Sequence, residues 1–422
     1  MSFLGDAAAL WLYDDEKARA MEPFALTRPA SALLAGTRLV RDRWALALAA
    51  SPVGTFCAAH LVPAFDGMGS PGNEIGGGSL IANARCVPAM ATARTDEDAP
   101  GPRVWRCAGR VAAVQLADTI GPAELIAGTA SLEALVPPGA ESIDLPGWWV
   151  EDSWDHIRIL PALLSDDIMR LARGALGGSP VTTPFEGPPA HAAVLGDYPV
   201  CLLAGAVIEP HVVLDATAGP ILIGPRATVQ AFTRLVGPLS IGEGSMVVGD
   251  RIASSAIGPV CKVRGEVSTS AFLGYSNKSH DGFVGHSYIG EWVNLGAGTT
   301  TSNLKNTYGT VMLETSAGSR DTGMQFLGTM FGDHAKTGIG VRLTTGTIIG
   351  AGANVYGSEM PPKLVPPFAW GDGTPYGIYT LDKFLQVADR AMGRRAVALS
   401  PGTRATLSAA HALGTTSGGR GR

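Results

Sequence analysis

The chain has 422 residues, which is enough for roughly two or three domains. Glycine supplies 55 of these residues, whereas charged side chains make up only 16%, a composition that excludes coiled coils and charge-rich disordered proteins. The formal net charge is −5 and no basic cluster is present, so nucleic acid is not an expected partner. The composition favours a globular protein with many tight turns and small inward-facing side chains.

Targeting and cysteine patterns predict a cytoplasmic protein. The first residues are acidic and lack the positively charged stretch of a secretory signal. The longest uncharged run, residues 44–65, contains two prolines, a glycine and a histidine, so we expect buried strand and turn there and no membrane span. The five cysteines are scattered, odd in number and without a CxxC pair, which favours reduced thiols.

Residues 1–160 are predicted to form an α/β domain. Residues 38–50 have the apolar spacing of a helix, and residues 104–116 alternate in short, strand-like pieces. Residues 161–189 are predicted to form a helical linker, in which Ser165 would cap a short helix over 166–175.

From about residue 190, aliphatic side chains recur at every sixth position. The recurring residues are Ile223, Val229, Leu235, Ile241 and Val247, then Ile289 and Leu295, then Leu343, Ile349 and Val355. Neither a helix nor a hairpin has this period, whereas in a parallel β-helix each hexapeptide forms one flat side with its aliphatic residue inside. We therefore predict a β-helix over residues 190–370.

Two interruptions and the C-terminus complete the predicted organisation. The hexapeptide rhythm breaks at residues 314–325, interpreted as a protruding loop, and at residues 359–367, interpreted as the end of the solenoid. Residues 371–412 are predicted to form a helical cap over the open end, and residues 413–422 a disordered tail.

Residues 265–306 read GEVSTSAFLGYSNKSHDGFVGHSYIGEWVNLGAGTTTSNLKN. This block resembles the acetyltransferase half of the bacterial bifunctional N-acetylglucosamine-1-phosphate uridylyltransferase/glucosamine-1-phosphate acetyltransferase. Together with PFALTRPASALLAG at residues 23–36, it resembles more closely a divergent bacterial family of sugar nucleotidyltransferases of that type. The resemblance implies a reduced nucleotidyltransferase-like α/β domain, then a left-handed parallel β-helix of hexapeptide repeats with a C-terminal helix. It also implies a homotrimer, with acetyl-CoA along the cleft between neighbouring solenoids.

The resemblance also assigns roles to single residues. His280 falls on the family's general base. The residues assigned to the sugar substrate are Glu266, Asn294, Asn303 and Lys278, and those assigned to acetyl-CoA are Gly296, Ala297, Gly338 and Ala351. Phe283 replaces a family tyrosine, and Ser268 and Asn277 replace family lysines that bind the sugar phosphate. These departures argue against glucosamine 1-phosphate as the acceptor. They argue less strongly against acyl transfer as the reaction.

Acyl transfer to an amine requires a base, because an amine attacks a thioester only when it is unprotonated. A neutral imidazole can take the proton and contributes about 10²–10⁴-fold in rate. Glu266 or Asp281 could orient the ring or hold the ammonium, and the turn at residues 296–298 could offer backbone N–H groups to the oxyanion.

The N-terminal domain retains only part of a nucleotide-binding loop. Sugar nucleotidyltransferases cradle phosphates with a glycine-rich loop, whereas residues 34–39 (LAGTRL) lack its GxG. Arg28 and Arg38 are candidate phosphate ligands, although ion pairs on the surface are the more common explanation of such residues. Mg²⁺ is expected only if this domain is active.

The main prediction is CoA-dependent acyl transfer to an amino sugar phosphate or sugar nucleotide in cell-envelope precursor synthesis. The alternative is a sugar-1-phosphate nucleotidyltransferase using UTP or dTTP, with the β-helix as a trimerisation scaffold. Two further alternatives are a structural trimer module and a zinc-dependent hydrase in which His280, His286 and His334 would bind the metal at a subunit interface. The main prediction includes no metal.

Overall fold

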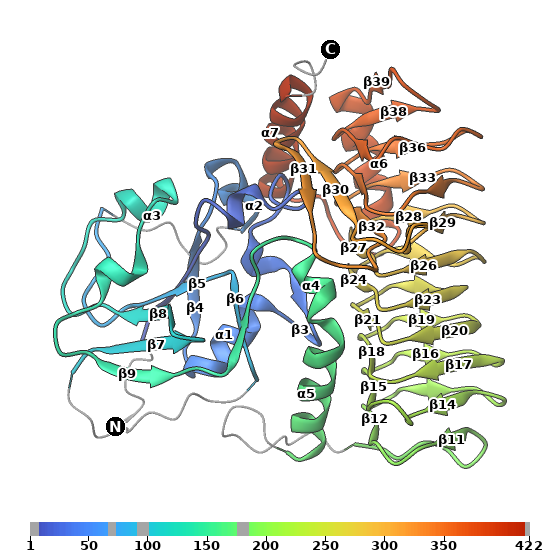
Figure 1. Cartoon of the computed structure of the whole chain (residues 1–422), viewed down its shortest axis with the longest axis horizontal. Helices are drawn as coiled ribbons and strands as arrows, with labels where there is room; N and C mark the ends of the chain where they lie inside the picture. The colour runs from blue at the N-terminus through green and yellow to red at the C-terminus, as the bar shows by residue number, and fades with distance from the viewer. Residues whose placement is uncertain (1–7, 66–72, 91–100, 175–184, 418–422) are drawn as a thin grey trace.

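The computed structural model describes residues 8–65, 73–90, 101–174 and 185–417. It consists of an α/β domain beside a parallel β-solenoid, with two C-terminal helices between them and near one end of the solenoid (Figure 1). The fold class predicted from the sequence, an α/β domain followed by a parallel β-helix and a C-terminal helix, is therefore confirmed.

The N-terminal domain is built around a mixed six-stranded sheet. In spatial order its strands are β4 (Pro52–Phe56), β1 (Leu10–Tyr13), β5 (Leu80–Asn83), β8 (Arg110–Gln115), β7 (Arg103–Cys107) and β9 (Glu141–Asp144). Strands β4, β1 and β5 are parallel, whereas β8 is antiparallel to β5 and β7. Helix α1 (Val40–Leu48) buries Trp44 in the same core as β1, so the predicted helix and strand pair in this domain are confirmed.

Smaller elements surround this sheet. They are the strand pairs β2 (Leu34–Ala35) with β3 (Arg38–Leu39) and β6 (Cys86–Pro88) with β10 (Gly147–Trp149), the helices α2 (Val62–Phe65), α3 (Ala123–Ala127) and α4 (Asp155–Arg158), and the 3₁₀ turns η1 (Ala18–Ala20), η2 (Ala30–Ala32), η3 (Ala59–Leu61) and η4 (Leu132–Leu135).

Helix α5 (Leu160–Ala172) connects the domain to the solenoid and begins earlier than predicted. Pro161 stands in its first turn, where a missing backbone N–H costs nothing because no intrahelical partner exists for it. Ser165 therefore lies inside the helix and is not its cap. The predicted helix end at residue 175 and residues 176–184 of the predicted linker lie outside the described residues.

The solenoid has three walls, each a parallel sheet with one strand per coil. The first wall contains β11 (Ala193–Leu195), β14 (Val213–Asp215), β17 (Thr233–Val236), β20 (Asp250–Ala253), β23 (Glu266–Ser268) and β26 (Phe283–Gly285), and is continued by the pair β29 (Thr300–Thr301) and β34 (Arg342–Leu343). The second wall contains β12 (Val200–Leu202), β15 (Ile221–Ile223), β18 (Leu239–Ile241), β21 (Ala256–Ile257), β24 (Ala271–Gly274), β27 (Tyr288–Glu291), β32 (Thr329–Phe331), β35 (Thr347–Ile349) and β37 (Leu364–Val365). The third wall contains β13 (Val207–Ile208), β16 (Thr228–Val229), β19 (Met246–Val247), β22 (Lys262–Val263), β25 (Asn277–Lys278), β28 (Asn294–Leu295), β33 (Lys336–Thr337), β36 (Asn354–Val355), β38 (Ala369–Gly371) and the antiparallel β39 (Gly377–Ile378).

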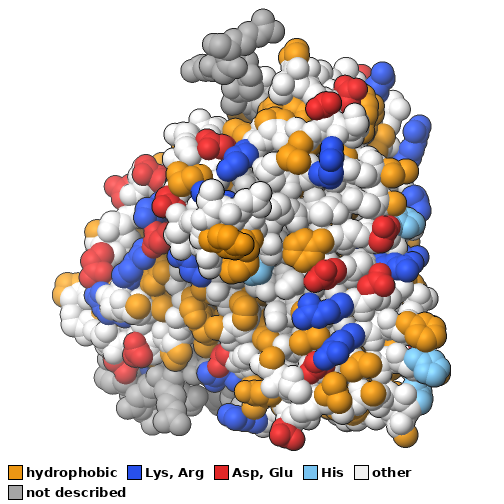
Figure 2. Space-filling view, turned by 45° about the vertical axis from the view of Figure 1, so that its right-hand side comes forward, with side chains coloured by type: hydrophobic (Ala, Val, Ile, Leu, Met, Phe, Trp, Pro, Cys, Tyr) orange, Lys and Arg blue, Asp and Glu red, His pale blue; other side chains and the backbone are white. Residues whose placement is uncertain are grey.

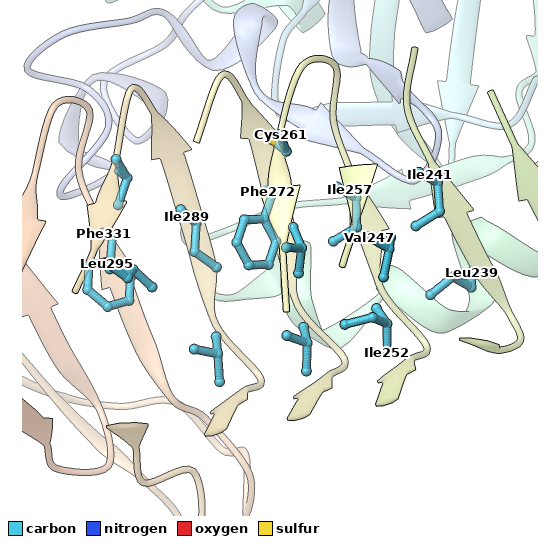
Figure 3. Close-up of a cluster of buried hydrophobic side chains, with 14 of the residues drawn as sticks. Leu239, Ile241, Val247, Ile252, Ile257, Cys261, Phe272, Ile289, Leu295 and Phe331 are labelled. Carbon is cyan, nitrogen blue, oxygen red and sulfur yellow. The ribbon is translucent and has the colours of Figure 1, made fainter. Parts of the chain in front are cut away.

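The residues of the six-residue repeat fill the interior of the solenoid. All ten aliphatic residues that define the repeat belong to one buried cluster. Figure 3 shows several of them, including Ile241, Val247 and Ile289, pointing inward from successive strands. Because each coil leaves its inner face to be covered by its neighbours, this stacked column supplies most of the apolar burial of the solenoid.

The first predicted interruption is a hairpin, β30 (Met312–Thr315) with β31 (Gly318–Asp321). It crosses from the solenoid toward the N-terminal domain (Figure 1), where Arg320 binds Asp152 at 2.5 and 2.8 Å. The second predicted interruption is not the end of the solenoid, because β37 and β38 add a further coil. Val365 and Ala369 are buried inside it.

The N-terminal domain packs against the outer face of the second wall. A buried cluster joins Phe24, Leu34 and Trp154 of the domain to Tyr288 and Met330 of the wall. The Tyr288 hydroxyl accepts a hydrogen bond from Leu34 N (2.7 Å) and donates one to Leu34 O (3.1 Å). This wall is therefore covered within one chain.

The C-terminal helices α6 (Leu381–Gly393) and α7 (Pro401–Ser417) pack alongside the solenoid. Phe384 of α6 contacts Phe368 and His334 at the corner between the second and third walls, and Thr406 of α7 donates to Leu61 O of the N-terminal domain. The helices thus join the two domains, which corrects the predicted cap over the open end. Residues 413–417, predicted in the tail, are helical, and 418–422 lie outside the described residues.

All five cysteines are buried, and no disulfide joins them. Among the helices that the structure describes, none has the length and apolar character of a membrane-crossing segment.

Candidate active site

His280 lies at the corner where the third wall turns into the first. Its loop, residues 279–282, joins β25 to β26, and the His280 side chain is exposed. The next corner loop along the solenoid braces this one, because Gly298 N donates to Asp281 O at 3.2 Å. The imidazole is therefore presented to solvent from a loop that the next coil helps to hold in place.

An open groove of about 880 Å³ runs along the first wall and ends beside the His280 loop. The strand register places successive outward-facing lining residues in one column, Val213, Arg234, Arg251, Glu266 and Phe283. Asp281 lines the same groove. Two carboxylates, Glu266 and Asp281, thus face the space nearest His280. Such a pair can hold a substrate ammonium.

Asn294 faces outward from the third wall, on the other side of the His280 corner. Its Oδ1 accepts a hydrogen bond from Asn277 Nδ2 at 2.9 Å, and Asn294 itself is exposed. Glu266 and Asn294 therefore flank the His280 loop from two different walls. A ligand bound by both Glu266 and Asn294 therefore has to extend across the corner between the first and third walls.

The residues predicted for acetyl-CoA are divided between two places. Gly296, Ala297 and Gly338 lie in corner loops above His280, which stack through a hydrogen bond from Gly340 N to Ala297 O (2.7 Å). A Cβ at Gly296 would lie 2.4 Å from Gly338 O, so glycine is required for this stacking. Ala351, in contrast, is completely buried at the corner between the second and third walls, a position that does not fit the predicted contact with acetyl-CoA.

Two of the three backbone amides predicted to bind the oxyanion already have partners within the protein. Gly296 N donates to Thr337 O at 3.1 Å, and Gly298 N donates to Asp281 O at 3.2 Å. These two amides maintain the stacking of the corner loops, which corrects their predicted role.

Lys278 also differs from its predicted role. Its side chain is completely buried, and its Nζ donates to His280 O at 2.5 Å and to Asp281 O at 2.8 Å. Burial lowers the pKa of Lys278 to about 8. The ammonium therefore lies beneath the His280 loop, where an external sugar does not reach it.

Asn303 lies at the corner between the first and second walls, across the width of the first wall from His280. Its Nδ2 is 2.9 Å from His286 Nδ1, and Phe326 stacks on the His286 ring with centroids 5.2 Å apart. Burial lowers the pKa of His286 to about 4, so the ring is neutral. Asn303 therefore belongs to a second polar cluster and not to the surroundings of His280.

Arg28, a candidate phosphate ligand, joins the two domains. Its Nε is 2.8 Å from Asp333 Oδ2 and its Nη2 is 2.9 Å from Glu291 Oε2. Thr27 Oγ1 donates to the same Asp333 oxygen at 2.7 Å. The guanidinium is buried and its charge is balanced by two carboxylates, which corrects its predicted role. Arg38 is exposed on β3.

An internal carboxylate occupies the partial nucleotide loop. Thr37 N and Thr37 Oγ1 donate to Asp167 Oδ2 at 2.9 and 3.0 Å, and a Cβ at Gly36 would lie 2.3 Å from that oxygen. Arg43 binds Asp167 Oδ1 at 2.8 and 2.7 Å, with both side chains completely buried. The Asp167 carboxylate thus accepts the hydrogen bond from the Thr37 amide that a bound nucleotide phosphate would need to accept.

Charged residues also gather where β1 and β5 end, the edge at which open α/β sheets bind ligands. Asp15 accepts from Arg85 at 2.7 Å and from Asn83 at 3.0 Å. Asp14 is buried with Oδ1 unpartnered among the described atoms, and burial raises its pKa to about 7. A pocket of about 440 Å³ lies next to this charged group, lined by Lys17, Ala20, Arg110, Glu151, Asp152 and Arg320.

The three histidines of the zinc alternative lie at three different corners of the solenoid. His280 lies between the third and first walls, His286 between the first and second, and His334 between the second and third. His334 is also enclosed by Phe384 of α6. Within the described ranges, no cluster of three or more metal-ligating side chains is present. The three rings do not converge within one chain, and His334 is buried, so it does not fit the predicted role of a zinc ligand shared with a neighbouring copy.

Comparison with known families concerns the first part of the chain. Residues 10–175 match the family model described as sugar nucleotidyl transferase, and this match covers less than half of the chain. The matched segment contains the mixed sheet, Arg28 and helix α5.

A curated relative combines two activities in its name. It is the bifunctional sugar-1-phosphate nucleotidylyltransferase/acetyltransferase of Sulfurisphaera tokodaii, 37% identical over 91 residues. The similar segment covers 22% of this chain and 23% of the relative. The chain is therefore similar to less than a quarter of that protein's length.

Among solved structures, the chain is similar to an Arabidopsis UDP-N-acetylglucosamine acyltransferase, with 10% identity, a TM-score of 0.28 and coverage of 52% of this chain and 94% of that one. It is also similar to a hexapeptide transferase family protein from Anaplasma phagocytophilum, with 14% identity, a TM-score of 0.25 and coverage of 49% and 93%. At these values neither structure supports an argument about chemistry.

Sequence reasoning missed the lower part of the groove. Arg234 and Arg251 enter it from the strands below Glu266, and Phe232 stacks on His211 at its edge with ring centroids 5.4 Å apart. Figure 2 shows basic and acidic side chains side by side on the solenoid face that is turned toward the viewer. The coil repeat could have indicated this part of the groove, because residues one coil apart on the outer face of a wall become neighbours in space.

Proposed function

We propose that the solenoid transfers an acyl group, in the first instance acetyl, from CoA to the amine of a sugar phosphate or nucleotide sugar, with His280 as general base. One observation carries this proposal. His280 is exposed at the end of a groove that Glu266 and Asp281 line. A carboxylate can bind the substrate amine in its ammonium form, and an imidazole can remove its proton, so the reaction needs both kinds of group next to the same nitrogen.

The proposed reaction follows from the charges of these side chains. Glu266 and Asp281 attract the substrate ammonium, which releases one proton to solvent to give the neutral amine. His280 takes a second proton from the nitrogen as the amine attacks the thioester carbonyl. The C–N bond forms, the C–S bond breaks, and the proton passes to the departing CoA thiolate. Gly296, Ala297 and Gly338 lie above His280 along the same corner and are the proposed neighbours of the CoA chain.

We further propose a homotrimer in which the active site lies between copies. The N-terminal domain covers the second wall, which leaves the first and third walls for contacts with other copies. Glu266 and Asn294 lie on these two walls, on either side of His280. A neighbouring solenoid on the first or third wall would convert the open groove into a closed cleft.

Nucleotidyl transfer by the N-terminal domain is the second candidate, favoured by the family model that residues 10–175 match. In this reaction the domain would join a sugar 1-phosphate to UTP or dTTP, with Mg²⁺ as the metal. Against it, Asp167 holds the amide of the partial loop, and Arg85 is already paired with carboxylates.

Two product assays separate the candidates. Purified protein is incubated with acetyl-CoA and either glucosamine 1-phosphate or UDP-glucosamine, and free thiol is measured. Parallel reactions contain UTP or dTTP, Mg²⁺ and N-acetylglucosamine 1-phosphate, and pyrophosphate is measured. Acyl transfer predicts amine-dependent thiol release that His280→Gln abolishes. Pyrophosphate without thiol release would instead support the second candidate.

A further inference from the structure

A lysine occupies a position inside the solenoid that the neighbouring coils fill with aliphatic residues. Lys278 is in register with Val263 below it, and Val263 is in register with Val247. Leu295 takes the corresponding place in the coil above, since Asn277 pairs with Asn294. A buried ammonium costs several kcal/mol unless hydrogen bonds compensate it, so a lysine in this column requires an explanation beyond packing.

The two hydrogen bonds of its ammonium lead directly to the loop that carries His280. Nζ is 2.5 Å from His280 O and 2.8 Å from Asp281 O. Both acceptors are backbone carbonyls, so the bonds hold two consecutive peptide groups, the one that joins His280 to Asp281 and the one that follows Asp281. The side chains of His280 and Asp281 stay exposed.

Gly265 leaves the space that the ammonium occupies. A Cβ on Gly265 would lie 3.0 Å from Lys278 Nζ and 2.5 Å from Gly282 O, and its φ of +94° also disfavours any side chain. Gly249, at the same corner one coil below, shares a positive φ of +133°, but its added Cβ would meet only Arg264 Nε at 3.6 Å. The absence of a side chain at Gly265 therefore leaves room for the Lys278 ammonium and the Gly282 carbonyl, whereas at Gly249 no comparably close group requires it.

We propose that Lys278 is a positioning residue, whose ammonium fixes the His280–Asp281 backbone so that the His280 imidazole is held at the end of the groove. This inference rests on the proposed role of His280 as base. A loop at a solenoid corner has few side chains of its own to hold it, and a charged donor makes stronger hydrogen bonds than a neutral one. The buried lysine thus orders the loop from inside and leaves its outer surface to the substrate.

The test compares Lys278→Met with Val247→Ala. Methionine keeps the length of the side chain and removes the donor, whereas Val247→Ala creates a small cavity in the same column, away from the His280 loop. We expect Lys278→Met to lower kcat for acetyl transfer to glucosamine 1-phosphate or UDP-glucosamine about 10- to 100-fold, the loss typical of a displaced catalytic group. Acetyl-CoA affinity should stay within about twofold. Val247→Ala should lower Tm with kcat unchanged.

A second pair of variants keeps the test decisive if Lys278→Met fails to fold. Gly265→Ala should reproduce the loss of kcat, because its Cβ intrudes on the ammonium and the loop. Gly249→Ala introduces similar backbone strain without those contacts and should retain kcat. Hydrogen–deuterium exchange gives a readout independent of activity. The backbone amides of residues 279–283 should exchange faster in Lys278→Met and Gly265→Ala, and not in the two controls.

The outcomes distinguish this inference from the proposed function. If His280→Gln retains full acyl transfer, the role of His280 as base is wrong, whatever Lys278 does. If His280→Gln is inactive but Lys278→Met loses only Tm, with kcat and loop exchange unchanged, Lys278 is merely a core residue and the inference is overturned. Loss of kcat together with faster loop exchange, alongside an inactive His280→Gln, supports both.

Discussion

The Arg28 guanidinium lies 2.8 Å from the Asp333 carboxylate although 305 positions separate the two residues. Both side chains are almost completely enclosed. Asp333 also accepts hydrogen bonds from Thr27 Oγ1 and from Glu291 N. A segment near the start of the chain is thereby joined to a solenoid corner near its end.

Replacing Arg28 should separate the two domains. Arg28→Met leaves the buried Asp333 carboxylate without its counter-charge, a change that costs about 3–5 kcal/mol in comparable buried pairs. We expect a large drop in Tm and faster proteolysis between the domains. Arg320→Gln, which breaks an exposed pair between the hairpin and Asp152, is the matched control and should cost about 1 kcal/mol or less. Equal effects of the two substitutions would contradict a structural role for Arg28.

Replacing His280 should affect the chemical step alone. Because the ring is exposed on its loop, His280→Ala removes a base and little packing. We expect kcat to fall about 10²–10⁴-fold, with unchanged Tm and nearly unchanged affinity for acetyl-CoA. His280→Gln should be almost as inactive, since an amide accepts a hydrogen bond but takes up no proton. Steady-state kinetics and isothermal titration with CoA measure the two quantities. A fall in Tm with full kcat would make His280 structural.

Light scattering should give a homotrimer, with a mass three times the 43.5 kDa of one chain. The first and third walls are flat and carry exposed apolar residues such as Val207 and Phe232, and bare surfaces of this kind are typical of protein contacts. Phe232→Glu would place a charge on that surface and should shift the mass toward one chain. A wild-type mass of about 43.5 kDa at micromolar concentration would contradict both the trimer and a site shared between copies.

Mild acid should destabilise the protein through its buried histidines. Burial lowers the pKa of His334 to about 3 and the pKa of His156 to about 4, whereas the same groups ionise near pH 6.5 in the unfolded chain. Below about pH 6.5 the unfolded state therefore binds more protons than the native state. The free energy of unfolding consequently decreases as the pH is lowered.

His334→Phe should reduce this acid sensitivity, because phenylalanine keeps the aromatic contacts with Trp292 and Phe384 and has no proton to bind. The measurement is the difference in Tm between about pH 7.5 and about pH 5 for both proteins. Replacement of the exposed His280 by Ala is the control and should leave the difference unchanged. An equal loss of Tm in wild type and His334→Phe would contradict a contribution from His334.

The hexapeptide period by itself determined the solenoid and its interior. One aliphatic side chain per flat side is a local requirement, repeated at fixed spacing, so Ile241 and Ile289 could be placed inside from the sequence alone. The exposure of His280 was predictable for the same reason, because it lies outside the inward positions of the repeat. The resemblance of the surrounding block supplied its proposed chemistry.

Only the tertiary structure decided what the remaining polar residues do. Lys278 occupies an inward position of the repeat, and its role depends on the carbonyls of the loop that folds over it. The partner of Arg28 lies 305 positions away along the chain, and Asn303 lies a full wall away from His280. No local pattern encodes such contacts, because a charged or amide side chain is compatible with a substrate, a surface or a buried partner. Which of these it meets is decided by how the domains and coils pack.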